Sequence, residues 1–429
     1  MTSMAEIRPF QALRFTEKAG SPADLCCPPY DIINEEQRQG YLARSGNNII
    51  RLELPKGDDP YREAGKTLNQ WREDGILATD AFDSIYIYEE EFTVRGERKK
   101  VKGFISRVRL TPFSEGVVLP HEETLSKAKE DRFLLMSETF CNFSQIYSLY
   151  FDEDNRCRYL IDCLSDGTPD VEFTDDTGVT HRLWAVDDEG YLSNLCNEFK
   201  DKKLYIADGH HRYETACNFA AKLKAEGKLE DGGAADYCMM MLVNIEHEGL
   251  VVFPTHRIVF GLENFSAEDI CAKLADTFIL SRHEGVDGIE PALDALYAQG
   301  KKACAMYTGK GSWTLMELKD TAVMETVLPS SSKALRELDV SVLHSLVLEQ
   351  NFGIDKANMA AQKNLRYTRD LAEALAAVDN GEADCSFILN PTRVEEISAV
   401  AAAGEKMPQK STYFYPKLIT GLVMNSFEE

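Results

Sequence analysis

Near the middle of the sequence, a short apolar strand stops at an Asp-Gly pair and is followed at once by an amphipathic helix. The strand covers Leu204 to Ala207, and apolar residues then recur at spacings of three and four from Tyr213 to Leu223, before Gly227 ends the helix. Strands that alternate with helices are typical of α/β proteins. We therefore expect an α/β fold with mixed sheets.

The residues at this strand-to-helix step also carry chemistry. We call the run Asp208-Gly209-His210-His211-Arg212 the phosphate box. The first turn of a helix offers unpaired N–H groups and a positive dipole end, Gly209 lets a ligand approach the backbone, and Arg212 can fork onto two phosphate oxygens. Asp208 could hold Mg²⁺ or a ribose hydroxyl. The alternative is a polar turn with a capping aspartate and two surface histidines.

Two loops add candidate site residues. The segment Pro120-His121-Glu122 places a carboxylate beside a histidine, so Glu122 is a candidate general base, although an ordinary surface loop would have the same composition. Tyr30 and Asp31 follow two prolines that restrict the backbone, which favours either a fixed carboxylate or a structural turn.

A polar patch precedes a predicted strand at Asn142 and Ser144. Turn satisfaction is the simplest interpretation of such residues, and contact with phosphate is the alternative.

The net charge of −24 argues against nucleic acid as a partner, because such a field repels phosphate backbones. The sign is inverted near the end of the chain, where residues 406–427 contain no acid but include Lys406, Lys410 and Lys417. Within this stretch Lys410-Ser411-Thr412, here called the tail motif, sets an ammonium beside two hydroxyls and is a candidate anion-binding segment.

Composition also bears on location. The first residues show no secretory pattern, and we find no run of about 18 apolar residues that could span a membrane. The 11 cysteines are scattered, odd in number and without a CxxC pair, which indicates reduced thiols. We expect a cytoplasmic protein without a membrane partner.

Periodicity predicts further elements. In the first half we expect helices at 34–43, 61–74, 126–139 and 193–199, and strands at 49–54, 85–94, 101–110, 145–151, two within 171–186, 237–245 and 250–253. After Pro254 we expect helices at 266–276, 289–299, 339–349, 370–379 and 392–403, with strands at 302–307, 313–318 and 384–389. A zinc site is not supported, since the paired histidines are adjacent and no cysteine pair has ligand spacing.

Several motifs together resemble a known superfamily. The phosphate box resembles that of the ParB/sulfiredoxin fold, most closely in the archaeal-type free serine kinases. The segment Pro120-His121-Glu122, followed by Glu130-Asp131-Arg132-Phe133, is similar to the part of those kinases that bears the catalytic glutamate. Residues 404–412, followed by Pro416, are similar to their tail. Over its full length the chain resembles the bacterial DUF1015 family, with Pro28-Pro29-Tyr30-Asp31 among the hallmarks.

The resemblance implies ATP- or ADP-dependent phosphorylation of a free hydroxy amino acid such as L-serine. It implies that Glu122 accepts the hydroxyl proton beside His121, and that Asp208 lies near Mg²⁺ or the substrate. The implied phosphate-binding residues are Gly209, His210, His211, Arg212, Ser144 and Asn142, and the implied substrate-binding residues are Lys410, Ser411, Thr412, Tyr30 and Asp31. No metal cage built from protein ligands alone is implied.

The implied organisation has three parts. Residues 1–80 form an N-terminal extension packed on the core, residues 81–260 a ParB/sulfiredoxin-like nucleotide-binding core, and residues 261–429 a C-terminal α/β domain. The tail at 404–420 is expected to return to the active site. The oligomeric state stays open, with a homodimer as one option.

Other functions compete with the kinase. The same phosphate site would serve a phosphoserine phosphatase or the reverse reaction. A non-catalytic ParB-like nucleotide-binding regulator would not need Glu122. A DNA-binding clamp would need a basic helix-turn-helix, which residues 225–300 lack, and sulfiredoxin chemistry would need a cysteine where His210 stands.

Overall fold

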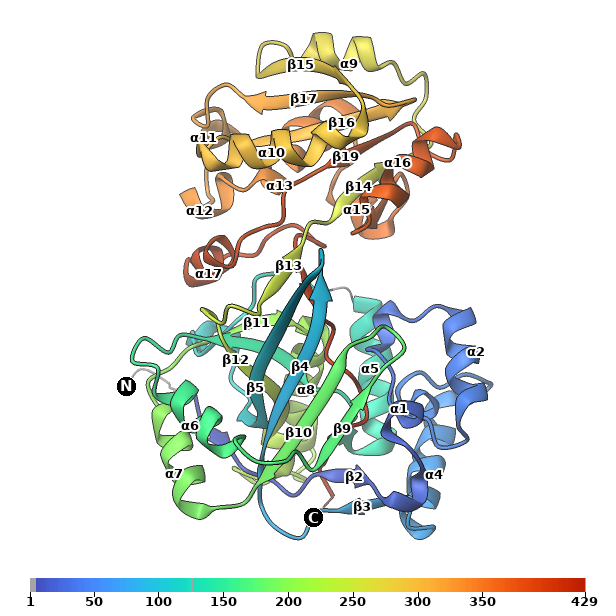
Figure 1. Cartoon of the computed structure of the whole chain (residues 1–429), viewed down its shortest axis with the longest axis vertical. Helices are drawn as coiled ribbons and strands as arrows, with labels where there is room; N and C mark the ends of the chain where they lie inside the picture. Colours follow the sequence, from blue (N-terminus) through green and yellow to red (C-terminus); the bar gives the residue numbers. More distant parts are fainter. Residues whose placement is uncertain (1–4, 123, 125, 429) are drawn as a thin grey trace. The chain divides into compact units, whose positions relative to one another are not determined.

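The computed structural model describes residues 5–122, 124 and 126–428, and the chain divides into two compact units. Unit 1 comprises residues 1–120, 124–251 and 416–429, and unit 2 comprises residues 121–123 and 252–415. Figure 1 shows both termini in unit 1. The short segment around His121 and Glu122 is thus built into unit 2, although the residues before and after it belong to unit 1.

Unit 1 is organised around one large mixed sheet with the strand order β6-β11-β8-β12-β5-β4-β10-β9, and with β1 on β5. Its strands are β1 (Ile7–Arg8), β4 (Ile85–Val94), β5 (Glu97–Arg109), β6 (Val118–Leu119), β8 (Ile146–Tyr150), β9 (Val171–Thr174), β10 (Thr180–Val186), β11 (Leu204–Asp208) and β12 (Tyr237–Asn244). Strand β12 runs parallel to β8, and β11 runs antiparallel to it. Two small ribbons pair β2 (Leu13–Phe15) with β3 (Leu77–Thr79) and β7 (Cys141–Asn142) with β21 (Asn425–Ser426).

The long hairpin β4–β5 forms where the sequence predicts it. Arg95 and Gly96 both take positive φ angles, 50° and 83°, as a two-residue turn that matches strand twist requires. The apolar residues of β4 and β5 reach into the main core, in which Ile87 and Phe104 are fully buried.

Helices surround this sheet (Figure 1). They are α1 (Pro22–Leu25), α2 (Glu35–Arg44), α3 (Ile50–Glu53), α4 (Pro60–Glu73), α5 (Ser126–Thr139), α6 (Arg156–Leu164), α7 (Glu189–Glu198) and α8 (His210–Ala225). Helices α5 to α8 contribute to the main core. Helices α1, α3 and α4 bury a second core against Leu135 of α5, so residues before 80 pack on the sheet-bearing part of unit 1.

The strand predicted at 49–54 is wrong. Residues Ile50–Glu53 form the helical turn α3, in which the N–H groups of Glu53 and Leu54 donate to the carbonyls of Ile49 and Ile50. The alternation of apolar and charged residues suggests a strand with one exposed face, but Glu53 is 2% exposed. The carboxylate of Glu53 is buried beside Arg132, which is distant in sequence, and does not contact solvent as a strand with one exposed face would require.

Unit 2 contains an antiparallel sheet with the order β15-β17-β16-β19-β14-β18. Its strands are β14 (His256–Val259), β15 (Phe278–Glu284), β16 (Ala303–Gly309), β17 (Ser312–Leu318), β18 (Leu365–Thr368) and β19 (Cys385–Ile388). Strand β13 (Val251–Phe253) pairs with β20 (Tyr413–Tyr415). Strand β15 was not expected, because its polar sequence suits an edge position and lacks the alternation of a half-buried strand.

The helices of unit 2 are α9 (Ala267–Leu274), α10 (Ile289–Ala298), α11 (Val323–Val327), α12 (Lys333–Arg336), α13 (Asp339–Val342), α14 (Gln350–Phe352), α15 (Lys356–Ala361), α16 (Leu371–Asp379) and α17 (Val394–Ala402). Helices α10 and α16 pack on the sheet to form its core. The helix predicted at 339–349 begins as α13 but continues as the π-helix η6 (Leu343–Glu349), a form that often occurs at functional sites.

The expected fold class, α/β with mixed sheets, is confirmed. None of the helices that the structure describes has the length and apolar character needed to cross a membrane. The cysteines are free thiols, in agreement with the expectation of reduced cysteines.

A buried carboxyl lies within the unit 1 sheet. Glu90 of β4 is fully buried, and burial raises its pKa to about 8. The Tyr88 hydroxyl lies 3.0 Å from Glu90 Oε1 and 2.7 Å from His181 Nδ1, while His181 Nε2 lies 3.2 Å from Asp175. When His181 donates from Nε2 to Asp175, its Nδ1 accepts the single Tyr88 hydrogen, and the tyrosine oxygen can accept from a protonated Glu90. The geometry therefore accommodates a neutral Glu90.

We expect this group to make the stability of the protein depend on pH. A carboxyl whose pKa is raised from 4.5 to about 8 binds its proton more tightly in the folded state, so the free energy of unfolding should fall as the pH rises from about 4.5 to about 8. Glu90→Gln should abolish this fall in the free energy of unfolding, which is on the order of a few kcal/mol. Burial also raises the pKa of Asp339, which adds to the pH dependence. Urea unfolding should therefore be measured for wild type and Glu90→Gln at each pH from 5 to 9. If the free energy of unfolding changed with pH equally in both proteins, Glu90 would not be the group responsible.

Candidate functional site

The phosphate box lies where β11 ends and α8 begins. Gly209 is the N-cap of α8 and has a φ of 94°, in the left-handed region. A Cβ atom at this position would lie 2.9 Å from Nη2 of Arg212, because the guanidinium folds back over the glycine. Glycine is therefore required both for the turn and for the approach of Arg212 to the first turn of the helix.

Asp208 is held between two cations. Nη2 of Arg212 lies 3.4 Å from one of its carboxylate oxygens, and Nζ of Lys417 lies 3.3 Å from the other. Arg212 also donates from Nη1 to the carbonyl of Gln145 at 2.5 Å. Two cations and the positive end of α8 thus surround a single carboxylate, so positive charge exceeds negative charge among these groups, as an anion site requires.

The two histidines of the phosphate box differ in access. His210 is buried, whereas His211 is half-buried. A ligand at the start of α8 would thus meet His211 more readily than His210.

A buried ion pair lies near this site. Glu53 and Arg132 are 2% and 6% exposed, and their charged groups are 3.8 Å apart. Burial raises the pKa of Glu53, and the nearby Arg132 and Arg212 oppose that rise. These residues, together with Ser144, line a cavity of about 30 Å³, which has room for water but not for a nucleotide.

The remaining candidates of unit 1 have defined contacts. Ser144 donates from Oγ to Glu53 Oε1 at 3.0 Å, and the side chain of Asn142 accepts from the N–H of Met239 at 3.2 Å. Tyr30 begins a short 3₁₀ turn, and the guanidinium of Arg132 lies 4.0 Å from its ring centre. Asp31 is exposed. Ser144, Tyr30 and the phosphate box thus share the Glu53–Arg132 surroundings, while Asn142 supports neighbouring strands.

In unit 2, two predicted segments lie together although about 290 residues separate them. The N–H of Ser411 donates to Glu122 Oε1 at 3.2 Å, and His121 Nε2 lies 3.0 Å from Thr412 Oγ1. The N–H of Met407 donates to the carbonyl of His121 at 2.7 Å, and Glu122 and Met407 form a parallel β-bridge. The tail motif thus orients both the imidazole and the carboxylate.

A buried arginine supports the tail motif from behind. Arg257 is fully buried and donates to His344 Nε2 and to the carbonyls of Thr255 and Lys410. Burial lowers its pKa to about 10, so the side chain stays charged at neutral pH. Lys410 has a φ of 56° and is exposed, and Arg257 holds its backbone through the carbonyl.

Sequence reasoning missed several of these residues. Glu53 was assigned to a strand, Arg257 and His344 carried no motif, and Lys417 was noted only as a basic residue of an acid-free stretch. Arg132 belonged to a motif that the resemblance singled out, but its partner is 79 residues away. A contact between residues so far apart in the chain cannot be recognised from neighbouring residues in the sequence.

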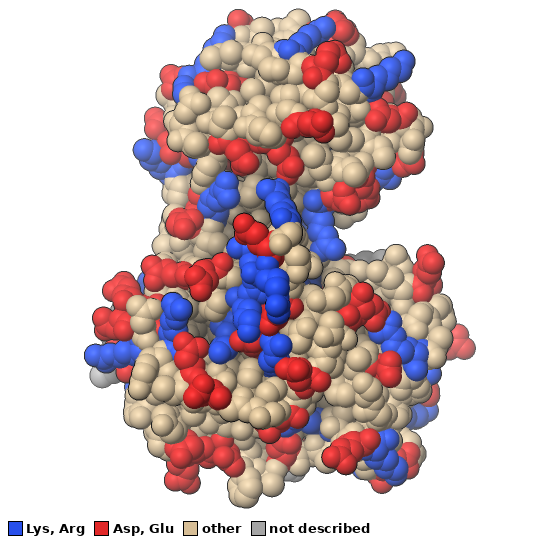
Figure 2. All heavy atoms as spheres, viewed as in Figure 1, with Lys and Arg blue, Asp and Glu red and all other residues tan. Residues whose placement is uncertain are grey.

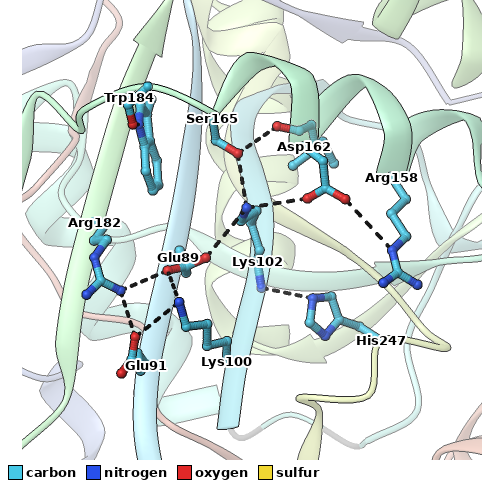
Figure 3. Close-up of polar contacts among 12 residues, drawn as sticks. Glu89, Glu91, Lys100, Lys102, Arg158, Asp162, Ser165, Arg182, Trp184 and His247 are labelled. Atoms are coloured by element: carbon cyan, nitrogen blue, oxygen red, sulfur yellow. Dashed lines mark hydrogen bonds and ion pairs between the residues drawn. The ribbon is translucent and has the colours of Figure 1, made fainter.

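A cavity of unit 1 lies elsewhere, at the opposite end of strands β8 and β12. It measures about 700 Å³ and adjoins Tyr150 and Asn244, the last residues of β8 and β12, whereas Asp208 pairs with Tyr147 nearer the start of β8. Figure 3 shows its polar wall, in which Lys102 reaches Ser165 at 3.1 Å and Asp162 at 3.4 Å. These contacts fasten α6 to the hairpin β4–β5.

Figure 2 shows lysine and arginine side chains gathered on the hairpin face of unit 1, with carboxylates among them. Arg182 and Lys100 both contact Glu89 and Glu91, which are almost fully buried. The positive charges of Arg182 and Lys100 on this surface are therefore compensated by carboxylates.

Among the described residues, no group of three or more His, Cys, Asp or Glu side chains could hold a metal ion. A magnesium ion is usually bound through one or two carboxylates together with substrate phosphates. Asp208 is the one carboxylate of the phosphate box, and its two oxygens are paired with Arg212 and Lys417, so a magnesium ion there would have to displace one of these cations.

We compared the chain with family models, curated proteins and solved structures, and found one matching family and several distantly similar structures. No curated protein matches the sequence. A conserved hypothetical protein from Pyrococcus furiosus is 16% identical, with a TM-score of 0.35, over 73% of this chain and 93% of that one. A mutant free serine kinase in complex with AMP is 15% identical, with a TM-score of 0.35, over 70% and 84%. SbnI with a C-terminal truncation, from Staphylococcus aureus, is 12% identical, with a TM-score of 0.34, over 73% and 86%.

A family model also matches the sequence. The model described as "Protein of unknown function (DUF1015)" covers residues 7–341, which is most of the chain and includes the Pro-His-Glu segment and the phosphate box. The chain therefore belongs to the DUF1015 family.

Proposed function

We propose that this protein is a phosphotransferase that passes a phosphoryl group from ATP or ADP to the hydroxyl of a small acceptor, with a free amino acid such as L-serine as the first candidate. The observation that carries the proposal is the pairing of Glu122 with Ser411 and of His121 with Thr412. These hydrogen bonds between two loops that are distant in sequence orient the carboxylate of Glu122 and the imidazole of His121. A general base must be oriented in this way. The motif resemblance to free serine kinases points to the same chemistry.

Each charged group has a proposed role. Arg212, Lys417 and the first turn of α8 bind the phosphates of the nucleotide. Asp208 is the residue that would hold Mg²⁺, which would neutralise phosphate charge. Glu122 accepts the proton of the acceptor hydroxyl. The hydroxyl oxygen then bonds to the terminal phosphorus as the bond to the bridging oxygen breaks, and the nucleotide leaves one phosphate shorter. Phosphoryl transfer needs mostly such positioning and charge neutralisation.

The direct test is incubation of the purified protein with Mg²⁺, ATP or ADP, and a panel of free amino acids and hydroxy acids, with products identified by mass spectrometry. We expect a phosphorylated acceptor and the shortened nucleotide in equal amounts. Release of phosphate from O-phosphoserine without nucleotide would instead favour the phosphatase. Nucleotide binding with neither reaction would favour the regulator.

Removing the guanidinium of the phosphate box should weaken nucleotide binding. A hydrogen bond to a charged group contributes about 1.5–3 kcal/mol, so Arg212→Ala should raise the Kd for ADP by about 10- to 150-fold. Calorimetry measures this, with Arg156→Ala as a control, because Arg156 is an exposed arginine of α6 in the same unit. Thermal unfolding of both variants checks that the fold is kept. Equal affinity in wild type and Arg212→Ala would exclude the assigned role.

A further inference from the structure

A second cavity, in unit 2, lies next to the Pro-His-Glu segment and has no assigned role. Its volume is about 130 Å³, and its walls come from Leu328, Ser331, the helices α12, α13 and α15, the π-helix η6, β18 and residues 406–409. Pockets for drug-sized ligands usually measure about 300–1,000 Å³. This one would therefore hold a single small metabolite but not a nucleotide.

Two hydroxyl groups in its wall are buried without a hydrogen-bond partner among the described residues. They are Oγ of Ser341, in a side chain that is 2% exposed, and Oη of Tyr367. Buried hydroxyls are costly to leave unpaired, and native proteins seldom do so without a ligand or water nearby. Both groups border the cavity, so a polar molecule inside it would supply the missing partners.

The π-helix shapes the same wall. His344 and Ser345 of η6 border the cavity, and His344 accepts from Arg257 through Nε2 at 3.2 Å. Burial and the adjacent arginine lower the pKa of His344, so its ring is neutral and carries its proton on Nδ1. The wall thus offers an uncharged donor beside the two hydroxyls.

The cavity adjoins the candidate base. Met407, which borders it, forms the β-bridge with Glu122. Tyr367 interacts electrostatically with Glu122, and its ring centre lies 5.4 Å from the guanidinium carbon of Arg257. A molecule in the cavity would therefore lie close to the carboxylate to which we assign proton transfer.

The charged residues of the wall suggest the chemistry of the occupant. Lys356 and Lys406 border the cavity and can attract a carboxylate, and Glu349, which also borders it, can attract an ammonium group. Leu328, Leu335 and Met359 provide an apolar side that suits a short carbon skeleton. The combination fits a small hydroxy carboxylate.

We propose that this cavity is the acceptor pocket, and that it binds a small carboxylate bearing a hydroxyl through Ser341, Tyr367 and the two lysines. The inference rests on the proposed phosphotransferase function and adds to it the place and class of the acceptor. It predicts that the two hydroxyls contribute to ligand binding and little to the stability of the ligand-free protein.

The experiment titrates L-serine, L-threonine, D-glycerate and L-alanine into the full-length protein by calorimetry, in the presence of ADP and Mg²⁺. We expect the three hydroxy carboxylates to bind more tightly than L-alanine. Ser341→Ala and Tyr367→Phe should each raise the Kd of the best ligand about three- to tenfold, as the loss of one hydrogen bond implies. Ser386→Ala is the matched control, since Ser386 of β19 also has a buried hydroxyl without a partner among the described residues but does not border the cavity.

Thermal unfolding separates binding from folding: without ligand, Ser341→Ala and Tyr367→Phe should be at least as stable as wild type. Ligand binding that depends on both hydroxyls would support the pocket even if no phosphoryl transfer followed, in which case only the proposed function would fail. An unchanged Kd in both variants, or no binding of any of the three hydroxy carboxylates, would overturn the pocket even if nucleotide-dependent phosphorylation of another acceptor were observed.

Discussion

Replacing Glu122 by glutamine should lower kcat for phosphoryl transfer by about 10²- to 10⁴-fold, the usual contribution of a general base. The amide can still accept the N–H of Ser411 through its oxygen, so the hydrogen bond that orients the side chain is kept. What is lost is the ability to take up a proton. Because the phosphate-binding cations belong to other segments, the Kd for nucleotide should stay within about twofold of wild type, less than a single lost hydrogen bond would cost.

The measurement is steady-state kinetics combined with nucleotide calorimetry on the same preparations. Glu396→Gln is a suitable control, because Glu396 of α17 is another carboxylate of unit 2 that accepts a backbone N–H, that of Arg393. It should leave kcat nearly unchanged. If Glu122→Gln turned over at the wild-type rate, Glu122 would not be the base.

Replacing Arg132 by methionine should lower the free energy of unfolding by about 3–5 kcal/mol, the usual cost of breaking a buried ion pair from one side. Glu53 would then remain buried without its main counter-charge, with Arg212 as its other nearby cation. The variant would also lose the hydrogen bond from Arg132 to the Glu53 carbonyl at 2.8 Å and the contact with the Tyr30 ring.

Denaturant unfolding tests this, and a second change identifies the cause. Adding Glu53→Gln to Arg132→Met should recover part of the lost stability, because it removes the uncompensated charge. Arg282→Met provides a surface comparison: Arg282 and Glu268 are 63% and 72% exposed, and such pairs contribute about 0–1 kcal/mol. A loss below about 1 kcal/mol for Arg132→Met would contradict a buried, stabilising pair.

Sequence patterns predicted those parts of the fold that depend on local chemistry. The hairpin around Arg95 and Gly96 could be predicted because a two-residue turn with positive φ angles has a recognisable sequence. The helix at 126–139 and the step from β11 to α8 followed from spacing alone. The helical turn at Ile50–Glu53 could not be predicted, because its conformation depends on burying Glu53 against a residue far along the chain.

The same limit applies to the candidate site. Motifs singled out Glu122, the phosphate box and the tail motif, since each carries unusual chemistry in a few residues. The hydrogen bonds from Ser411 to Glu122 and from His121 to Thr412 join segments about 290 residues apart, and only the folded chain reveals them. Supporting residues such as Arg257 and Lys417 act through burial and proximity, which leave no pattern in the sequence.

Transfer of a phosphoryl group from a nucleotide to an alcohol can be followed by ³¹P NMR of the wild-type protein mixed with Mg²⁺, ATP or ADP, and L-serine. We expect a new phosphomonoester resonance that grows in step with the loss of the terminal nucleotide phosphate and that is nearly absent with Glu122→Gln. Growth of inorganic phosphate alone, or an unchanged spectrum with every hydroxy carboxylate tried, would contradict phosphoryl transfer to an alcohol.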